Sequence, residues 1–169
     1  MSNETPNTSK SFNKIKINDK KVEVHFTTHL ILPEDQGVRN IKIPIESDVK
    51  PHKDFFDAFQ ELKKYAIGYM ELSVFKGAID AKILDSHIVT TLSITEDQDT
   101  VKIMISMNKY LKGGKCYSVT SPLIDIYNED FSELKKLQKC YDKVIAEAKL
   151  YLEGKNGELQ LSFSFEKAA

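Results

Sequence analysis

Short segments in which every second residue is apolar recur along this chain, and they restrict its fold more than any other feature. The first two segments, residues 15–17 and 22–26, flank a polar stretch of Asn18, Asp19 and Lys20. Successive side chains of a strand point to opposite faces, so this alternation fits a sheet with one buried face. Two such segments joined by a short turn predict an antiparallel β-hairpin.

The same alternation returns in later segments. Residues 41–45 predict a third strand, and Pro44 within it indicates a sheet edge or a strand end, because proline cannot donate to a neighbour. Residues 88–94 and 101–107 predict two strands joined by an acidic turn at 96–99. Their expected inward faces are Ile88, Thr90, Leu92 and Ile94, then Val101, Ile103, Ile105 and Met107. Gly113 and Gly114 predict a turn into a strand at 116–120, which Ser121 and Pro122 close.

Two segments have helical periodicity instead. Residues 55–70 predict one helix, with an irregular last turn at Gly68. A second helix is expected to start near Asp130 and Glu133, which fit a capping box, and to stop at Gly154. The expected apolar stripes are Phe55, Phe56, Phe59, Leu62, Ala66, Tyr69 and Met70, then Phe131, Leu134, Leu137, Tyr141, Val144, Ala148, Tyr151 and Leu152. Five lysines are expected to face outward on the second helix: Lys135, Lys136, Lys139, Lys143 and Lys149.

Strands grouped by hairpin-length turns predict an α+β fold, a mainly antiparallel sheet with two principal helices packed on one face. The length of 169 residues fits one domain. Residues 1–11 are polar and aperiodic, so we expect a flexible N-terminal arm followed by a single domain at 12–169. Residues 159–165 alternate again and are expected to form either a terminal strand or a docking peptide.

The charged residues and the cysteines restrict the classes of partner and the cellular location that we expect. The net charge is -1, and among 24 basic residues only Arg39 is an arginine, which disfavours sequence-specific DNA readout but leaves weak backbone binding through lysine open. Cys116 and Cys140 lack metal-binding spacing, so we expect reduced, buried, small apolar residues. The chain has no apolar run of about 18 residues and no signal-like N-terminus, so we expect no membrane partner and a cytoplasmic location.

Residues for catalysis or metal binding do not gather in the sequence, so we expect no enzyme, no catalytic residue, no cofactor and no metal. His25 and His29 lie in a β pattern, where four residues span about 13 Å, too far for joint coordination. Glu96, Asp97 and Asp99 lack the EF-hand pattern and predict a solvated turn. The aromatic residues 55, 56 and 59 could stack on bases, but their helical spacing favours the core.

One short segment suggests a protein partner. Gln160, Leu161, Phe163 and Phe165 fit the Q-L-x-Φ-x-Φ hexapeptide by which bacterial DNA-metabolism proteins dock into the sliding clamp. An extended peptide of this kind binds through a glutamine hydrogen bond and apolar anchors. The same alternation also fits a strand that completes the sheet, and Leu159 extends it upstream.

Several segments together resemble a group of uncharacterised bacteriophage early-region proteins. They are residues 14–24, 51–55 with Ala58 and Leu62, 121–124, and 148–155 running into Gln160 and Leu161. The resemblance implies an origin near phage recombination and replication genes, and it carries over no catalytic residue.

Three functions follow as hypotheses. The first is a non-enzymatic phage protein accessory to DNA replication or recombination, contacting host machinery such as the sliding clamp, or DNA. The second is an antagonist of bacterial antiviral defence that sequesters a nucleotide signal or blocks a defence protein, expected as a homo-oligomer with a pocket between subunits lined by lysines and aromatics. The third is an enzyme with groups that converge only in three dimensions.

Overall fold

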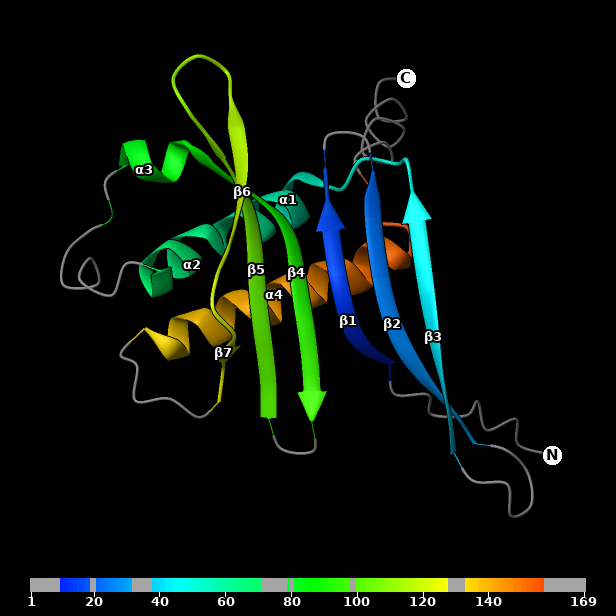
Figure 1. The fold of residues 1–169 in the computed structure, drawn as a ribbon. Coiled ribbons are helices and arrows are strands. Elements are labelled where there is room, and N and C mark those ends of the chain that lie inside the picture. Colours follow the sequence, from blue (N-terminus) through cyan, green and yellow to red (C-terminus); the bar gives the residue numbers. More distant parts are fainter. Residues whose placement is uncertain are drawn as a thin grey trace, which may run out of the picture.

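A computed structural model describes residues 10–18, 21–31, 38–70, 79, 81–97, 100–127 and 133–156. Within these residues seven strands form one sheet, in which all pairings are antiparallel, and helices lie against one of its faces. The predicted α+β class is confirmed (Figure 1). Among the described residues, no helix has the length and apolar character needed to span a membrane.

The first three strands form a meander. β1 (Lys10–Ile17) pairs with β2 (Val22–Ile31), and β2 pairs with β3 (Val38–Ser47). β1 begins five residues before the alternating segment 15–17, because Lys10, Ser11 and Phe12 also pair with the long second strand. β3 is an edge of the sheet, as Pro44 predicted.

The second half of the sheet continues from β1. β4 (His87–Asp97) pairs with β1 and with β5 (Thr100–Tyr110), and β5 pairs with β6 (Cys116–Thr120) and with the short β7 (Ile124–Asp125). The strand order is therefore β3-β2-β1-β4-β5-β6, with β7 beside β5. The strands predicted at 88–94, 101–107 and 116–120 are all present.

A β-bulge in β4 corrects one predicted face. The register with β5 shifts between Val89 and Thr91, so Thr90 is the extra residue. One extra residue reverses the alternation, and Val89 is fully buried whereas Ile88 is 40% exposed. The prediction that Ile88 and Thr90 face inward with Leu92 was wrong for this reason. On β5 the predicted residues Ile103, Ile105 and Met107 are all fully buried.

The first predicted helix is divided into two. α1 (Lys53–Glu61) and α2 (Lys63–Met70) are separated by a turn at Leu62. The break lies there and not at Gly68, which is buried inside α2. The short α3 (Ala81–Asp85) leads into β4.

α4 (Leu134–Leu152) is the longest described helix, and it matches the prediction better at its end than at its start. Its N-cap residue is Glu133, which makes no side-chain capping hydrogen bond, and Asp130 of the expected capping box lies outside the described residues. At the other end Gly154 has φ 103°. The Lys155 N–H donates to Leu150 O at 2.8 Å and the Gly154 N–H to Tyr151 O at 3.1 Å, which is a Schellman motif.

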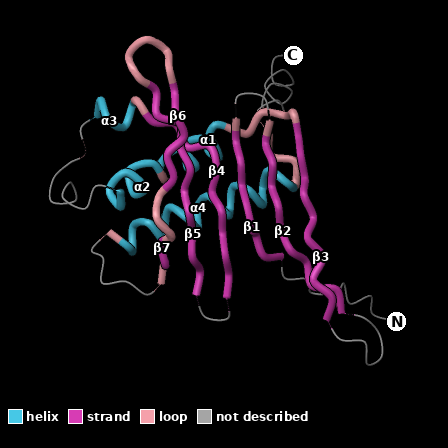
Figure 2. The backbone as a smooth tube through the Cα atoms, in the orientation of Figure 1, coloured by secondary structure: helices cyan, strands magenta, loops and turns pink. Residues whose placement is uncertain are grey.

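The core lies between the sheet and its helix layer. α1, α2 and α4 run across the same face of the sheet (Figures 1 and 2). Phe55 and Phe59 of α1 and Leu137 and Val144 of α4 are buried against the inward strand residues. The opposite face carries alternating polar side chains, as expected for an antiparallel sheet with one solvated face.

Candidate functional site

A surface pocket of about 450 Å³ lies where the β1–β2 hairpin meets the connection from β3 to α1. Its volume falls within the range typical of small-molecule sites. Two sequence segments far apart in the chain supply its walls, one from the hairpin and one from the start of α1. The lining residues are Ile17, Asn18, Lys21, Lys50, Pro51, Lys53 and Phe56.

Three of these residues are lysines, and the pocket is therefore rich in positive charge. Lys21 is paired with Glu46, and Lys53 with Asp57. The hydrogen bond from each ammonium to its carboxylate raises the pKa of both lysines, so both are charged at neutral pH. Among the described residues Lys50 has no ion-pair partner.

Exposed ion pairs of this kind contribute little, about 0–1 kcal/mol in general, so an incoming anion competes with them readily. An ammonium group that exchanges a side-chain carboxylate for a ligand phosphate keeps one ionic partner throughout. The unpaired Lys50 offers its charge without any such exchange. The pocket can therefore accept an anion without leaving a buried charge unpaired.

Phe56 gives the pocket an apolar wall. Its side chain is 42% exposed, whereas its neighbour Phe55 is 1% exposed. The prediction that Phe55, Phe56 and Phe59 all belong to the core was therefore wrong for Phe56. Consecutive helical residues point about 100° apart, and this rotation places Phe56 to one side of the stripe that α1 buries through Phe55 and Phe59. An exposed ring face beside lysines suits a flat, partly apolar ligand group.

The wall formed by residues 49–53 is fixed from behind by the end of α4. The Tyr151 hydroxyl donates to Val49 O at 2.7 Å, and Pro51 forms an isolated antiparallel bridge with Asn156. The Tyr151 ring packs on Phe55 with centroids 5.8 Å apart. These contacts fix the backbone that carries Lys50 and Lys53 before any ligand binds, which lowers the entropic cost of binding.

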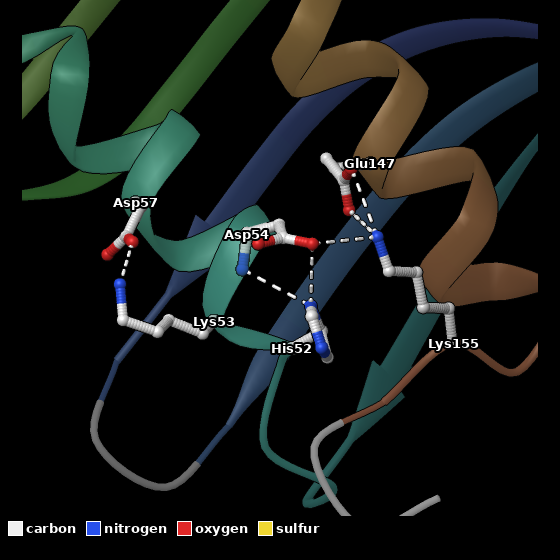
Figure 3. A network of polar contacts seen from close by, with 6 residues as sticks. All are labelled: His52, Lys53, Asp54, Asp57, Glu147 and Lys155. Atoms are coloured by element: carbon white, nitrogen blue, oxygen red, sulfur yellow. Dashed lines mark hydrogen bonds and ion pairs between the residues drawn. The ribbon is translucent and has the colours of Figure 1, made fainter. Parts of the chain in front are cut away.

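A polar network continues this attachment (Figure 3). Lys155, just beyond α4, contacts Asp54 Oδ2 at 3.2 Å and Glu147 Oε2 at 2.9 Å. The hydrogen bond from Lys155 lowers the pKa of Asp54, and the hydrogen bond to Glu147 raises the pKa of Lys155. The network ties the first turn of α1 to α4.

His52 is the N-cap residue of α1 and is 9% exposed. Its Nδ1 accepts from the Asp54 N–H at 3.2 Å and also lies 3.1 Å from Asp54 Oδ2. The first contact needs an unprotonated Nδ1 and the second a protonated one, so only one forms at a time. His52 therefore caps α1 and orients the connection that leads into it.

The other histidines lie apart from the pocket. His87 is 5% exposed and its Nδ1 lies 2.7 Å from Ile83 O. His25 Nε2 is 3.9 Å from Glu23 Oε2, too far for a hydrogen bond. Within the described ranges no three His, Cys, Asp or Glu side chains are placed to hold a metal ion.

Two further predictions concern residues elsewhere. The docking-peptide residues Gln160, Leu161, Phe163 and Phe165 lie outside the described residues. Cys140 is buried as expected, but Cys116 is exposed on β6, so that part of the cysteine prediction was wrong. β6 is the last strand on its side of the sheet.

The sequence reading missed Lys21, Lys50 and Lys53 as a group. They are separated by up to 32 positions and have no motif spacing. The helical projection of residues 55–62 was a usable signal, because it places Phe56 about 100° from Phe55 and off the stripe of Phe55, Phe59 and Leu62. Comparisons with protein-family models, with curated proteins and with solved structures found no match to this chain.

Proposed function

We propose that the protein is a non-enzymatic binding module that holds a phosphorylated small molecule with a flat ring, of the nucleotide class, in the pocket between the β1–β2 hairpin and α1. The observation that carries this proposal is the combination of Lys21, Lys50 and Lys53 with the exposed ring of Phe56 around one cavity of about 450 Å³. Ammonium groups bind phosphate oxygens as point charges, and the ring face stacks on a base.

Of the three hypotheses from the sequence, this site favours sequestration of a nucleotide signal. A protein that captures such a signal needs a positively charged, preorganised pocket and no bond-making groups. The resemblance to phage early-region proteins agrees with an antagonist of bacterial antiviral defence. In that reading the connection at 49–53, fixed by Tyr151 and Lys155, keeps the pocket ready for the ligand.

Isothermal titration calorimetry with purified protein tests the proposal. The ligands are ATP, cyclic AMP, cyclic di-AMP and cyclic di-GMP, with inorganic phosphate and adenosine as separate probes of the two halves of the pocket. We expect at least one nucleotide to bind, and Lys50→Gln with Lys53→Gln to weaken that binding at least tenfold.

The matched control is Lys135→Gln with Lys139→Gln, which removes the same charge from the exposed side of α4. Equal loss of affinity in the control and pocket variants would mean that net charge, and not the pocket, holds the nucleotide. Lack of binding by all four nucleotides at millimolar concentration would reject the proposal.

A second candidate function rests on the hexapeptide Gln160 to Phe165. In this reading the protein is accessory to phage DNA replication or recombination and docks into the host sliding clamp as an extended peptide. A pull-down with purified clamp tests it. We expect Gln160→Ala with Phe163→Ala to abolish capture, and unchanged capture would remove this candidate.

A further inference from the structure

The β5–β6 hairpin has a surface unlike the rest of the molecule. Its strands pair through Lys109↔Tyr117 and Tyr110↔Cys116, and the Leu111 N–H donates to Lys115 O at 2.8 Å. Residues 110–118 are all exposed. Figure 1 shows the hairpin extending past the end of the sheet, clear of α1, α2 and α4.

The β5–β6 hairpin carries a positive charge that no acidic residue of the same segment neutralises. Residues 100–124 contain four lysines and no aspartate or glutamate, in a chain whose net charge is -1. Three of these lysines, Lys109, Lys112 and Lys115, lie in the hairpin. The neighbouring α3 has one basic residue, Lys82, and one acidic residue, Asp85, so it adds no net charge. This charge distribution is complementary to a polyanion.

Large apolar and aromatic side chains stand beside these lysines. Tyr110 is 43%, Leu111 45% and Tyr117 45% exposed. The Lys109 ammonium lies 5.9 Å from the centroid of the Tyr117 ring, so the ring and the charge form one unit. Neighbouring strand residues face opposite ways, so Tyr110 and Tyr117, on adjacent rungs, supply one ring to each face of the hairpin.

We propose that the β5–β6 hairpin binds single-stranded nucleic acid, with bases stacked on Tyr117 and Tyr110 and phosphates held by Lys109, Lys112 and Lys115. Rings interleaved with cations are the recurring means of binding single strands without sequence preference. Lysine without arginine fits this role, because lysine neutralises phosphates but does not read base edges in pairs.

The tip favours a nucleic acid over a membrane surface. Residues 112–115 are Lys-Gly-Gly-Lys, and Gly113 and Gly114 have φ 98° and 80° with open space around them. A membrane-inserting hairpin would carry its apolar residues at the tip, whereas here they lie behind it on both faces. A strand of nucleic acid can follow such a ribbon and approach the bare glycine backbone closely.

The hairpin lies at the same end of the sheet as the pocket, because β1, β3 and β5 all end there (Figure 1). The two proposals nevertheless use different residues, and neither requires the other. Loss of nucleotide binding in the pocket variants would leave hairpin binding intact, and the reverse also holds.

Fluorescence anisotropy of a labelled 20-nucleotide oligo-dT with the full chain tests the hairpin proposal. We expect Lys112→Gln with Lys115→Gln to weaken binding at least tenfold, and the charge-matched pair Lys135→Gln with Lys139→Gln to leave it unchanged. Loss of one stacked base predicts a weakening of about fivefold or more for Tyr117→Leu, a variant that keeps the apolar volume. Circular dichroism and thermal melting confirm that each variant is folded.

Three outcomes would overturn the proposal. They are no binding of oligo-dT at low salt, equal loss in the α4 control, and an affinity for polyglutamate or for vesicles of phosphatidylserine that matches the affinity for oligo-dT. Tighter binding of a 20-base-pair duplex than of the single strand would also count against it, because paired bases cannot stack on Tyr110 or Tyr117.

Discussion

Phe55 and Phe56 are neighbours in α1 and lie in opposite environments. Phe55 packs in the core against Phe59 and Tyr151, whereas Phe56 faces the pocket. Consecutive helical side chains diverge by about 100°, and Phe56 therefore lies outside the stripe that α1 buries through Phe55 and Phe59. Phe55 is therefore expected to contribute to stability, and its neighbour Phe56 to the proposed ligand binding.

We expect Phe55→Ala to lower the free energy of unfolding by about 3–5 kcal/mol, because it leaves a cavity in the core. Phe56→Ala should change it by no more than about 0.5 kcal/mol, as for other exposed positions. Urea denaturation followed by circular dichroism measures both. Calorimetry of Phe56→Ala should then show weaker nucleotide binding, and an equal loss of stability in the two variants would contradict this assignment.

The two cysteines also differ in exposure, since one is buried and the other is exposed. Cys140 is 4% exposed, and burial raises the pKa of its thiol to about 12. At pH 8 this thiol therefore stays protonated and unreactive, whereas the exposed Cys116 is accessible. We expect a thiol-specific chromogenic reagent to modify one cysteine rapidly in the native protein and both in urea. Cys116→Ser should remove the rapid phase, and a rapid phase of two thiols would show that Cys140 is accessible.

At the scale of elements, the end of α4 connects the helix layer to the pocket. Gly154 closes the helix in a left-handed conformation, and Lys155 then extends to Asp54. The Tyr151 hydroxyl reaches Val49 from the last turn. These two contacts thus make the end of the helix the back wall of the pocket.

Gly154→Ala tests the helix end directly. A side chain at φ 103° is strained, although nothing lies within 4 Å of the added carbon. We expect a loss of about 1–2 kcal/mol in the free energy of unfolding, which is the cost of the left-handed conformation alone. Gly154→Asn should lose less, because asparagine tolerates this conformation. Equal losses in a urea titration would point to another cause.

The ion pair between Asp54 and Lys155 should make stability depend on pH. The pKa of Asp54 is lowered in the folded protein, so its contribution is present above the unfolded value and is lost as pH falls through the folded value. We expect wild type to melt above Asp54→Asn at neutral pH. The difference in melting temperature should begin to shrink as pH falls below the unfolded value of about 3.9, and it should disappear once the carboxylate of the folded protein is protonated as well. A difference that persists there would show that another interaction is responsible.

At the scale of the molecule, one end of the sheet gathers the features that suit anionic partners. The antiparallel order brings the ends of β1, β3 and β5 together, and with them the pocket and the β5–β6 hairpin. The core and the helix layer hold these elements in fixed relative positions, so ligand binding at this end stabilises the whole domain.

A nucleotide present at 100 times its dissociation constant should raise the free energy of unfolding by about 2.7 kcal/mol in wild type. Thermal melting with and without ligand measures the effect. Lys50→Gln with Lys53→Gln should show little of this stabilisation at the same concentration, while the α4 control variant should match wild type. Equal stabilisation of all three proteins would place the ligand outside the pocket.

Local periodicity was enough to predict the α+β class, the antiparallel sheet, the edge position of β3 and the glycine that ends α4, because each depends on neighbouring residues. Tertiary packing alone decided the bulge at Thr90, the break at Leu62 and the exposure of Phe56, since these depend on where a second element lies. It also assembled the pocket, because Lys21 and Lys50 meet only when the β1–β2 hairpin and the start of α1 are brought together. Spacing along the chain carries no information about such a meeting.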